Sequence, residues 1–396
     1  MKQLFENRNN LFDGLGDVSG TPEENFIAEI NNTSEKLNKK KIIDLAHKNG
    51  IQADETQIKE LYEVAIMRSL KNRLTDDIFE DYKIALEIYN NQVNFAHRTS
   101  NSVLLQQYST PLPLAYLAGA YVAHKQKNNV RYFEPSAGNG FLTVAFNSKN
   151  MIVNEIDKNR TENLREFGDF YLVTSEDASK PFPKWERSFD GIITNPPFGN
   201  WDTEKISGYP IKKLEFIMSI RALDTMRNSG RAAIIIGGHT EWDEFNRVEN
   251  GANRYFLSYL YHYYNVEDVI NINGQMYAKQ GTTFPIRLIL INGRKATPDG
   301  TAPLKTDYDK TVNNFYELFD RVAIYLSLPH KKMWENTYYT HLERFSPYSS
   351  NFAKKKQNEW LEIPSKSERK RKALEEIERE MKIAIAEMEI EMNINH

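Results

Sequence analysis

The sequence predicts an α/β protein built on a doubly wound, mostly parallel sheet. The first observation is that short apolar runs alternate with helical stretches after Leu104, as is typical of parallel strands covered on both faces. The second is that a glycine-containing turn directly follows the first of these runs. Ligands of such sheets bind outside the carboxyl ends of the strands, so functional residues are expected there.

This α/β region is expected to cover residues 105–295. Its strand candidates are the apolar runs at 130–133, 151–153, 171–173, 191–193, 232–236 and 286–291. The segment Thr297-Pro298-Asp299-Gly300 has the composition of a turn and interrupts the pattern. We therefore expect the sheet to end before it.

The region before the sheet, residues 1–104, is predicted to be helical. Thr21 followed by Pro22 and two acids is typical of a helix start. Apolar residues recur at helical spacing over 54–73, and 78–96 has the same character. No catalytic pattern is visible in these helices, so we expect a helical accessory domain.

Two further regions follow the sheet. Residues 296–364 are expected to form a small, α-rich C-terminal region that could take part in target recognition, with aromatic and basic side chains around Trp334. Residues 365–396 are predicted to form a highly charged helix. Such a helix is typical of a solvated face or of a surface that binds a protein partner.

Composition limits the function classes. The 396 residues include no cysteine, which excludes disulfides, thiolate metal sites and cysteine nucleophiles and suits a reducing compartment. No run resembles a signal peptide or a membrane span, so a cytoplasmic protein without membrane contact is expected. The net charge of −3 neither supports nor excludes nucleic-acid binding, while 12% aromatic residues are compatible with stacking on bases.

The first chemical motif is FEPSAGNGFL, residues 133–142. A strand ends in Glu134, a turn containing Gly138 and Gly140 follows, and a helix is expected to begin. Glycines let the backbone turn tightly and approach a ligand closely, and a helix N-terminus adds amide donors. The spacing does not match the dinucleotide fingerprint GxGxxG, and a plain strand-to-helix turn remains the alternative.

Acids follow the next two strand candidates. Glu155 lies about twenty residues beyond the first turn, where a carboxylate can accept hydrogen bonds from ribose hydroxyls. Asp157 is expected to cap a helix that begins near Lys158. Asp177, in the loop after the third strand, could accept from an adenine amino group or could be an ordinary loop acid.

The segment Thr194-Asn195-Pro196-Pro197-Phe198-Gly199 follows the fourth strand candidate. Pro196 and Pro197 restrict the backbone, Asn195 supplies a side-chain acceptor and Phe198 an apolar ring. An exocyclic amine needs such a site, because its lone pair is delocalised and acceptors must draw its hydrogens. The aromatic ring can then stack on a base that has left its helix.

Together these motifs resemble the Rossmann-like adenine-specific DNA methyltransferases whose cofactor motif precedes the catalytic motif. FEPSAGNGFL is similar to their cofactor motif, and NPPF at 195–198 to their catalytic motif. Tyr108-Ser109-Thr110-Pro111 is similar to a segment that touches the methionine end of their cofactor, and Tyr277 matches an aromatic that flanks the flipped base. The resemblance covers about 105–295.

The resemblance implies S-adenosylmethionine as cofactor, DNA as partner and no metal. Glu134 and the turn at 138–140 would hold the amino-acid part, Glu155 the ribose, Ile156 the adenine ring and Asp177 the adenine amino group. The implied cofactor residues are Tyr108, Thr110, Glu134, Pro135, Ala137, Gly138, Gly140, Glu155, Ile156, Asp177 and Asn195. The implied catalytic residues are Asn195, Pro196, Pro197 and Phe198, with Phe198 and Tyr277 at the substrate base.

Four alternatives stay open. The chain could methylate adenine in RNA, a glutamine side chain of a release factor, or the amino group of cytosine, although the last reaction more often has Ser or Asp in place of Asn195. It could also be a catalytically silent DNA-binding scaffold subunit. His239 could face the site or be an ordinary loop histidine. A role in restriction–modification, in protecting a mobile element or in a larger complex is equally open.

Overall fold

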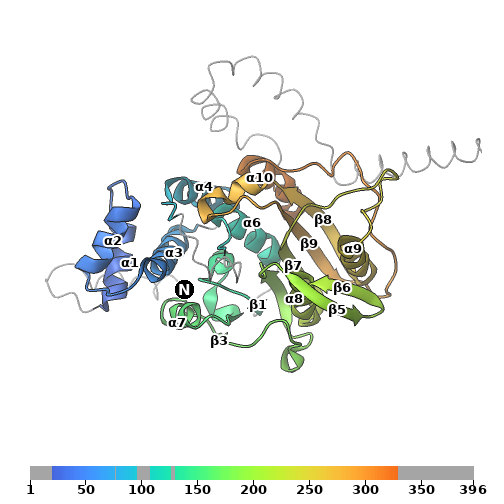
Figure 1. The fold of residues 1–396 in the computed structure, drawn as a ribbon, viewed down its shortest axis with the longest axis horizontal. Coiled ribbons are helices and arrows are strands. Elements are labelled where there is room, and N and C mark those ends of the chain that lie inside the picture. The colour runs from blue at the N-terminus through green and yellow to red at the C-terminus, as the bar shows by residue number, and fades with distance from the viewer. Residues whose placement is uncertain (1–19, 76, 96–107, 126–129, 329–396) are drawn as a thin grey trace, which may run out of the picture.

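The computed structural model describes residues 20–75, 77–95, 108–125 and 130–328 of the chain (Figure 1). The aromatic and basic stretch around Trp334 and the charged helix expected over 365–396 lie outside these residues. Among the described residues, no helix is long and apolar enough to cross a bilayer.

A seven-stranded sheet forms the centre of the molecule, in the order β3-β2-β1-β4-β7-β9-β8. Its first five members in this order pair in parallel, and β9 runs antiparallel to both β7 and β8. Its strands are β1 (Tyr132–Glu134), β2 (Met151–Asn154), β3 (Leu172–Thr174), β4 (Phe189–Thr194), β7 (Met226–Gly237), β8 (Tyr264–Ile272) and β9 (Ile286–Arg294). The predicted Rossmann-like α/β fold is confirmed.

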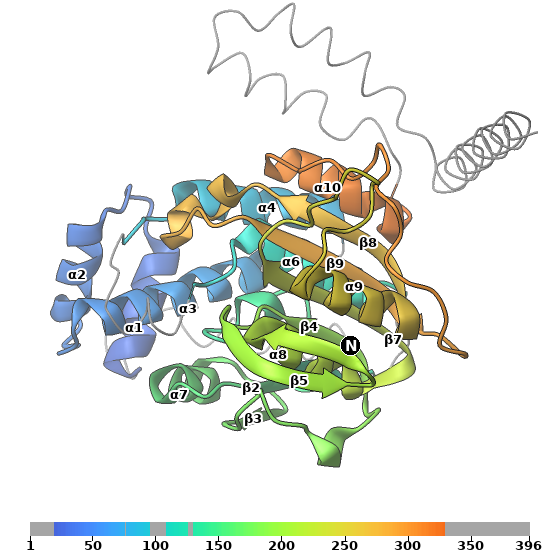
Figure 2. The same cartoon turned by 45° about the vertical axis from the view of Figure 1, so that its right-hand side comes forward.

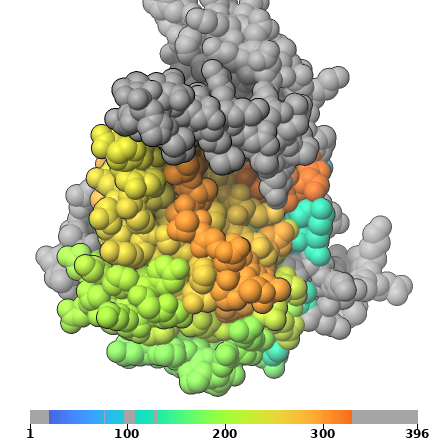
Figure 3. All heavy atoms as spheres, turned by 90° about the vertical axis from the view of Figure 1, so that its right-hand side faces the viewer, coloured from blue at the N-terminus to red at the C-terminus, as the bar shows by residue number. Residues whose placement is uncertain are grey.

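Helices cover both faces of this sheet, and each face has its own hydrophobic core (Figure 2). On one face lie α6 (Leu112–Ala123), α7 (Lys158–Phe167) and α10 (Phe315–Ala323); on the other lie α8 (Leu214–Asp224) and α9 (Ala252–Tyr263). The segment after β9, orange in Figure 3, crosses the surface beside α9, where Ser258 Oγ lies 2.9 Å from Thr301 Oγ1.

The helix predicted over 78–96 ends at Asn91, but the N-terminal region otherwise forms helices as the sequence predicts. They are α1 (Pro22–Asn32), α2 (Lys39–Lys48), α3 (Glu55–Arg73) and α4 (Ile78–Asn91). Thr21 and Asp54 cap α1 and α3, each in a reciprocal capping box. The prediction that a helix begins at Thr21-Pro22 is therefore confirmed.

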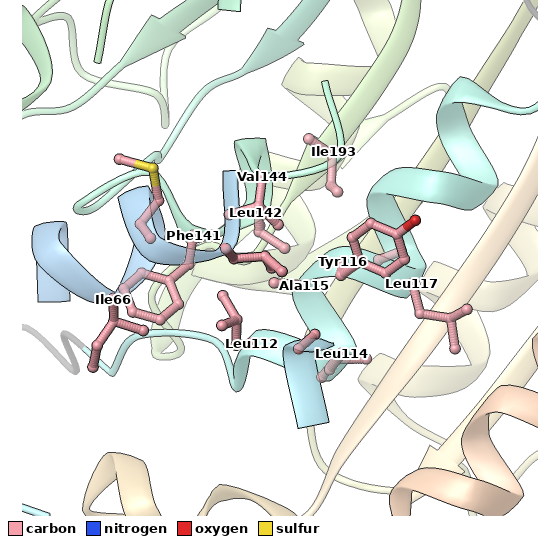
Figure 4. Packing of buried hydrophobic residues seen from close by; sticks show 14 of the residues in the cluster. Ile66, Leu112, Leu114, Ala115, Tyr116, Leu117, Phe141, Leu142, Val144 and Ile193 are labelled. Atoms are coloured by element: carbon pink, nitrogen blue, oxygen red, sulfur yellow. The ribbon is translucent and has the colours of Figure 1, made fainter. Parts of the chain in front are cut away.

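These N-terminal helices share the hydrophobic core of α6 and α10. Figure 4 shows Ile66 of α3 in the same cluster as Leu112 of α6 and Phe141. The Tyr82 hydroxyl of α4 donates to the Phe315 carbonyl at 2.7 Å, and the Tyr89 hydroxyl donates to the Met276 carbonyl at 2.8 Å. The domain boundaries at residues 104, 295 and 364 stay predictions.

The prediction of a helix after Gly140 is wrong. The chain instead forms two short 3-10 turns, η2 (Phe141–Thr143) and η3 (Ser148–Asn150). Every residue from Phe141 to Val144 is buried, so this segment has no polar face that a surface helix would turn to solvent. Gly119 of α6 also packs closely here, since a Cβ at that position would lie 2.8 Å from the Ala145 Cβ.

The apolar runs of the sequence did not reveal three strands. β8 is an edge strand in which polar residues interrupt the apolar ones and only part of the strand is buried, so it carries no continuous apolar run. The other two form a hairpin, β5 (Asn200–Ile206) and β6 (Tyr209–Lys213), that directly follows the NPPF segment. Its turn consists of Ser207 and Gly208, both with positive φ, which is the backbone of a tight hairpin turn.

Candidate active site

A cavity of about 680 Å³ opens at the carboxyl ends of the parallel strands. Its walls come from the turns after β1, β2, β3 and β4 and from the segment before α6. Of the residues implied at the cofactor, those that line it are Tyr108, Thr110, Pro135, Ala137, Gly138, Glu155, Ile156, Asp177 and Asn195. Glu134 and Gly140 are not among the lining residues.

The glycine turn and Glu155 hold each other in place. The Gly138 amide donates to Glu155 Oε2 at 2.7 Å, and the Asp157 amide donates to Oε1 at 2.8 Å. Gly138 has φ +56° and Gly140 φ +88°, conformations that favour glycine. A carboxylate has about four acceptor positions, so each Glu155 oxygen can still accept from a ligand. Asp157 caps α7 at its first turn, as predicted.

Glu134 lies beneath the cavity at the end of β1 and is fully buried. Its Oε1 accepts from the Ser136 amide at 3.0 Å. Its Oε2 is buried without a hydrogen bond, and the Thr194 hydroxyl beside it is engaged with Ser136 Oγ at 3.0 Å. Burial raises the pKa of Glu134 well above 4.5 despite the Ser136 donors. A cationic ligand group would satisfy this carboxylate.

The rim of the cavity combines an apolar surface and an acid. Ile156 is 67% exposed, although it is a large hydrophobic residue, and its side chain lines the cavity. Asp177 uses Oδ1 to accept from the amide and the hydroxyl of Ser179, at 2.9 and 2.7 Å. An aromatic ring lying on Ile156 would reduce its exposure, and the Asp177 carboxylate could accept from an amino group on that ring.

The NPPF segment lies beyond this cavity and is fixed from two sides. Asn195 Nδ2 donates to Thr110 Oγ1 at 2.9 Å, so the remaining polar atom of the Asn195 side chain, Oδ1, is an acceptor. The Gly199 amide donates to Glu215 Oε2 at 2.9 Å. Burial raises the pKa of Glu215, and burial lowers the pKa of the nearby Arg287 to about 10.

A second cavity of about 370 Å³ adjoins the first. Tyr108 and Asn195 line both cavities. The other lining residues of the second cavity are Pro196, Phe198, Gly199, Asn200, Lys213, Glu215, Gly237, Tyr277, Thr282, Phe284 and Ile286. The NPPF segment therefore separates two adjoining spaces, and Asn195 faces both.

The two implied aromatic residues lie differently in this second cavity. Phe198 is half-buried, whereas Tyr277 is only 2% exposed. Burial raises the pKa of Tyr277, and the Thr110 and Asn195 side chains near its hydroxyl oppose this effect. The aromatic residue that lies open beside Phe198 is Phe284, 53% exposed, with ring centroids 6.3 Å apart and planes 42° apart.

Gly237, at the end of β7, explains how both rings fit here. A Cβ at this position would lie 2.8 Å from Phe198 Cδ2 and 3.0 Å from Phe284 Cε1. Those distances are shorter than normal contacts between carbon atoms. The glycine is therefore required for both rings to pack against the end of the strand.

Sequence reasoning missed several residues of the site. Phe284 follows Tyr277 in an ordinary polar stretch, and only its packing distinguishes it. Glu60 and Glu63 of α3 hydrogen-bond to residues that line the larger cavity. The sequence signal that could have indicated Glu60 and Glu63 is the presence of two acids three residues apart in a helix that is otherwise rich in apolar residues.

His239 lines neither cavity, and its Nε2 lies 2.9 Å from the Ile272 carbonyl oxygen. It is therefore a loop histidine with a backbone partner. In the described ranges, no cluster of three or more His, Asp or Glu side chains is arranged to hold a metal ion.

Comparison with known proteins identifies the family of this chain. Residues 98–315, more than half of the chain, match the family model described as N-6 DNA Methylase. A curated relative, Type II methyltransferase M.AccI of Acinetobacter calcoaceticus, is 27% identical over 169 residues, which are 37% of this chain and 30% of the relative. The match thus spans less than a third of that relative.

Similar solved structures include a class I S-adenosylmethionine-dependent methyltransferase of Listeria monocytogenes, with a TM-score of 0.41 and 13% identity over 76% of this chain and 95% of that one. Another is the M protein of the type I restriction enzyme EcoKI, with a TM-score of 0.40 and 12% identity over 77% and 78% of the two chains. Because the family model covers most of the sheet and both cavities, the chain belongs to the N-6 DNA methylase family.

Proposed function

We propose that this protein transfers a methyl group from S-adenosylmethionine to the exocyclic amino group of adenine in DNA. The observation that carries the proposal is the pair of adjoining cavities with Asn195 in both walls. A reaction between a large donor and a planar acceptor needs two such spaces that meet at the reacting atoms. The larger cavity would take the donor and the smaller one the base.

The residues of the larger cavity fit the donor. Its volume of about 680 Å³ lies in the range of ligand sites for molecules of this size. Glu155 would accept from the ribose hydroxyls, and Ile156 with Asp177 would bind the adenine ring and its amino group. The orphaned Oε2 of Glu134 would face the positive ammonium of the methionine part, with Tyr108 and Thr110 alongside.

The smaller cavity fits a planar base with an amino group. Phe198 offers a ring for stacking, and Phe284 offers a second ring on the open side. A base between two rings needs about 7 Å between them, twice the roughly 3.5 Å contact distance of carbon atoms. The ring centroids of Phe198 and Phe284 are 6.3 Å apart, so the two rings would have to move apart slightly to admit a base. Stacking would compensate part of the cost of unstacking the base from DNA.

The reaction follows from this placement. S-adenosylmethionine supplies a methyl carbon that is already electrophilic. Asn195 Oδ1 and the Pro196 carbonyl would accept the two hydrogens of the amino group, which favours a tetrahedral nitrogen with its lone pair directed at that carbon. The nitrogen–carbon bond forms while the carbon–sulfur bond breaks, its electron pair stays on sulfur, and one amine proton leaves to solvent.

The test is methyl transfer by the purified full-length chain, using donor labelled in the methyl group. Unmethylated duplex DNA, single-stranded DNA and RNA are compared, and the products are digested to nucleosides and identified by mass spectrometry. We expect N6-methyladenine from DNA. If only RNA is labelled, the substrate is RNA rather than DNA. If the label is found in cytosine, the methylated base is cytosine rather than adenine. If the donor binds but its methyl group is transferred to no polymer, the protein is a catalytically silent scaffold.

Residues outside the two cavities carry the remaining parts of the proposal. The charged segment 365–396 would bind a protein partner, and 296–364 would contribute to target recognition. The absence of cysteine suits an enzyme that works on DNA in a reducing cytoplasm.

A further inference from the structure

Helix α3 lies outside the part of the chain that matches the family model, yet it sends two acids to the wall of the larger cavity. Glu60 is 8% exposed and Glu63 only 1% exposed. Figure 1 places α3 beside α7, the helix that follows Glu155. Buried carboxylates are costly unless charged or hydrogen-bonding groups satisfy them, so their partners reveal what they hold.

Glu63 connects two separate walls of the cavity. Its Oε2 accepts from Ser109 Oγ at 2.6 Å and from Asn139 Nδ2 at 2.9 Å. Ser109 belongs to the segment before α6, and Asn139 lies between the two glycines of the turn after β1. Both residues line the cavity. One carboxylate oxygen therefore fixes the distance between these walls.

Glu60 supports the same turn from a second direction. It forms a two-point pair with Arg160 of α7, with Arg160 Nε 2.9 Å from Oε2 and Nη2 3.0 Å from Oε1. Oε2 also accepts from Asn139 Nδ2. Asn139 Oδ1 accepts from Asn163 Nδ2 at 3.2 Å. The Asn139 side chain is thus held at both of its polar atoms.

The charges of this cluster balance. Lys59 Nζ lies 3.3 Å from Glu63 Oε1, so two carboxylates face two cations. Burial acts to raise the pKa of Glu60, but the attraction and hydrogen bonds of Arg160 outweigh it and the pKa is lowered. The attraction of Glu63 raises the pKa of Lys59. Both effects favour the charged forms of Glu60 and Lys59.

A hydrophobic contact would cover the same surface with a smaller desolvation cost, since buried ion pairs are often no more stabilising than apolar groups of similar size. What apolar side chains cannot do is fix hydrogen-bond donors in one geometry. The cluster connects α3 to both cavity walls and to α7, whose capping residue Asp157 also donates its amide to Glu155.

We propose that Glu63, supported by Glu60 and Arg160, is a positioning residue that sets the width of the donor cavity and so its affinity for the methyl donor. The proposal rests on the proposed function in one respect, the identity of the donor as S-adenosylmethionine. It assigns helix α3 to the cofactor site, although α3 contributes no lining residue itself. Loss of the bridge would weaken donor binding and leave the chemical step unchanged once the donor is bound.

The test compares variants of the full-length chain by calorimetric titration with S-adenosylmethionine. Glu63→Met removes both acceptor oxygens and keeps a side chain of similar size. Glu63→Gln keeps one oxygen that can accept from Ser109 and Asn139, although it loses the charge opposite Lys59. Ser109→Ala removes one donor only. Glu87→Gln is the matched control, because Glu87 is an exposed acid of α4 that pairs with Arg73 of α3 at 3.0 Å, away from the cavity.

We expect Glu63→Met to raise the Kd about tenfold or more, Glu63→Gln and Ser109→Ala about threefold, and Glu87→Gln not at all, in line with hydrogen bonds to charged groups. In turnover assays the KM for the donor should rise while kcat at saturating donor stays within about twofold. A merely structural role would instead lower the melting temperature without this separation of KM and kcat.

The outcomes separate the two proposals. If the unmodified protein does not bind S-adenosylmethionine, the proposed function fails. If it binds and Glu63→Met binds equally well, the positioning role fails. Equal weakening in Glu63→Met and Glu63→Gln would also contradict it, because charge rather than the hydrogen-bonded bridge would then matter. Should Glu63→Met not fold, Ser109→Ala decides, and an unchanged Kd in that variant overturns the role.

Discussion

The Asn195 amide nitrogen donates a hydrogen bond to the Thr110 hydroxyl oxygen at 2.9 Å, across 85 positions of the sequence. This contact leaves Oδ1 as the polar atom of the Asn195 side chain that can accept from the proposed substrate amine. It joins the segment before α6 to the NPPF segment, and both of these residues line the donor cavity. The orientation of the acceptor therefore depends on a residue that does not belong to the NPPF motif.

Thr110→Val should lower kcat by roughly 10–100-fold, because the isosteric side chain no longer holds the Asn195 amide and the acceptor loses its orientation. Donor affinity, measured by titration, should fall much less than kcat, although Thr110 also lines the donor cavity. Thr110→Ser keeps the hydroxyl and should retain most of the activity. Asn195→Ala should abolish transfer while donor binding survives. Retained transfer in Asn195→Ala would remove this residue from the mechanism.

Phe198→Ala should reduce kcat/KM for DNA more than Phe198→Tyr or Phe198→Trp, since the proposed role is stacking and both larger replacements keep a ring. We expect a loss of roughly 10–100-fold for alanine, in the range of 1–3 kcal/mol per stacked base. The measurement is initial rate against DNA concentration at saturating donor. Equal losses in all three variants would contradict stacking.

Phe284→Ala should raise the KM for DNA by about tenfold and leave donor binding unchanged, because Phe284 lines only the smaller cavity. Phe245→Ala is the control: Phe245 is also a largely exposed phenylalanine, at 61%, but it lines neither cavity. A competition assay between methylated and unmethylated duplexes should show the same difference in DNA binding between Phe284→Ala and Phe245→Ala. Identical KM values for the two variants would exclude Phe284 from the base site.

Glu134→Gln should change how stability depends on pH. Burial raises the pKa of folded Glu134 above its ordinary 4.5, so the folded protein binds this proton more tightly than the unfolded chain. Stability contributed by the protonated form is present below pH 4.5 and falls as pH rises toward the folded pKa. Glutamine removes this loss, and a gain of roughly 1–3 kcal/mol at neutral pH is expected.

The measurement for Glu134 is thermal unfolding without donor at several pH values from about 4, near the ordinary pKa of a carboxyl group, to about 8. The variant and the unmodified protein should differ most at the highest pH. Parallel curves would show that Glu134 is not the group responsible. If its carboxylate also binds the ammonium of the donor, the same variant should bind S-adenosylmethionine more weakly, which a titration at neutral pH will measure.

Much of the fold followed from local pattern. Continuous apolar runs identified the parallel strands, because those strands are buried on both faces. Capping residues such as Thr21 and Asp157 were recognisable because a helix start needs local acceptors. The acid Glu155 was also identifiable, since its role depends on a fixed distance along the chain from the glycine turn.

The rest depends on contacts between distant positions. The acids of α3 reach Asn139 from 76 and 79 positions away, and nothing in the sequence near Glu63 specifies that partner. Tyr277 and Phe284 are both aromatic, and only three-dimensional packing makes one buried and the other open. The helix predicted after Gly140 does not form for the same reason, since residues from distant parts of the chain bury this segment on every side.

The long-range bonds of α4 have a consequence for folding on the ribosome. Tyr82 and Tyr89 bond to carbonyls that are 233 and 187 positions later in the chain, and contacts of such separation form late. While the later residues are still being synthesised, the apolar side of α4 has no final partner and is open to aggregation or chaperone binding. Helix α4 is synthesised before α10, so its packing is completed only when α10 has left the exit tunnel.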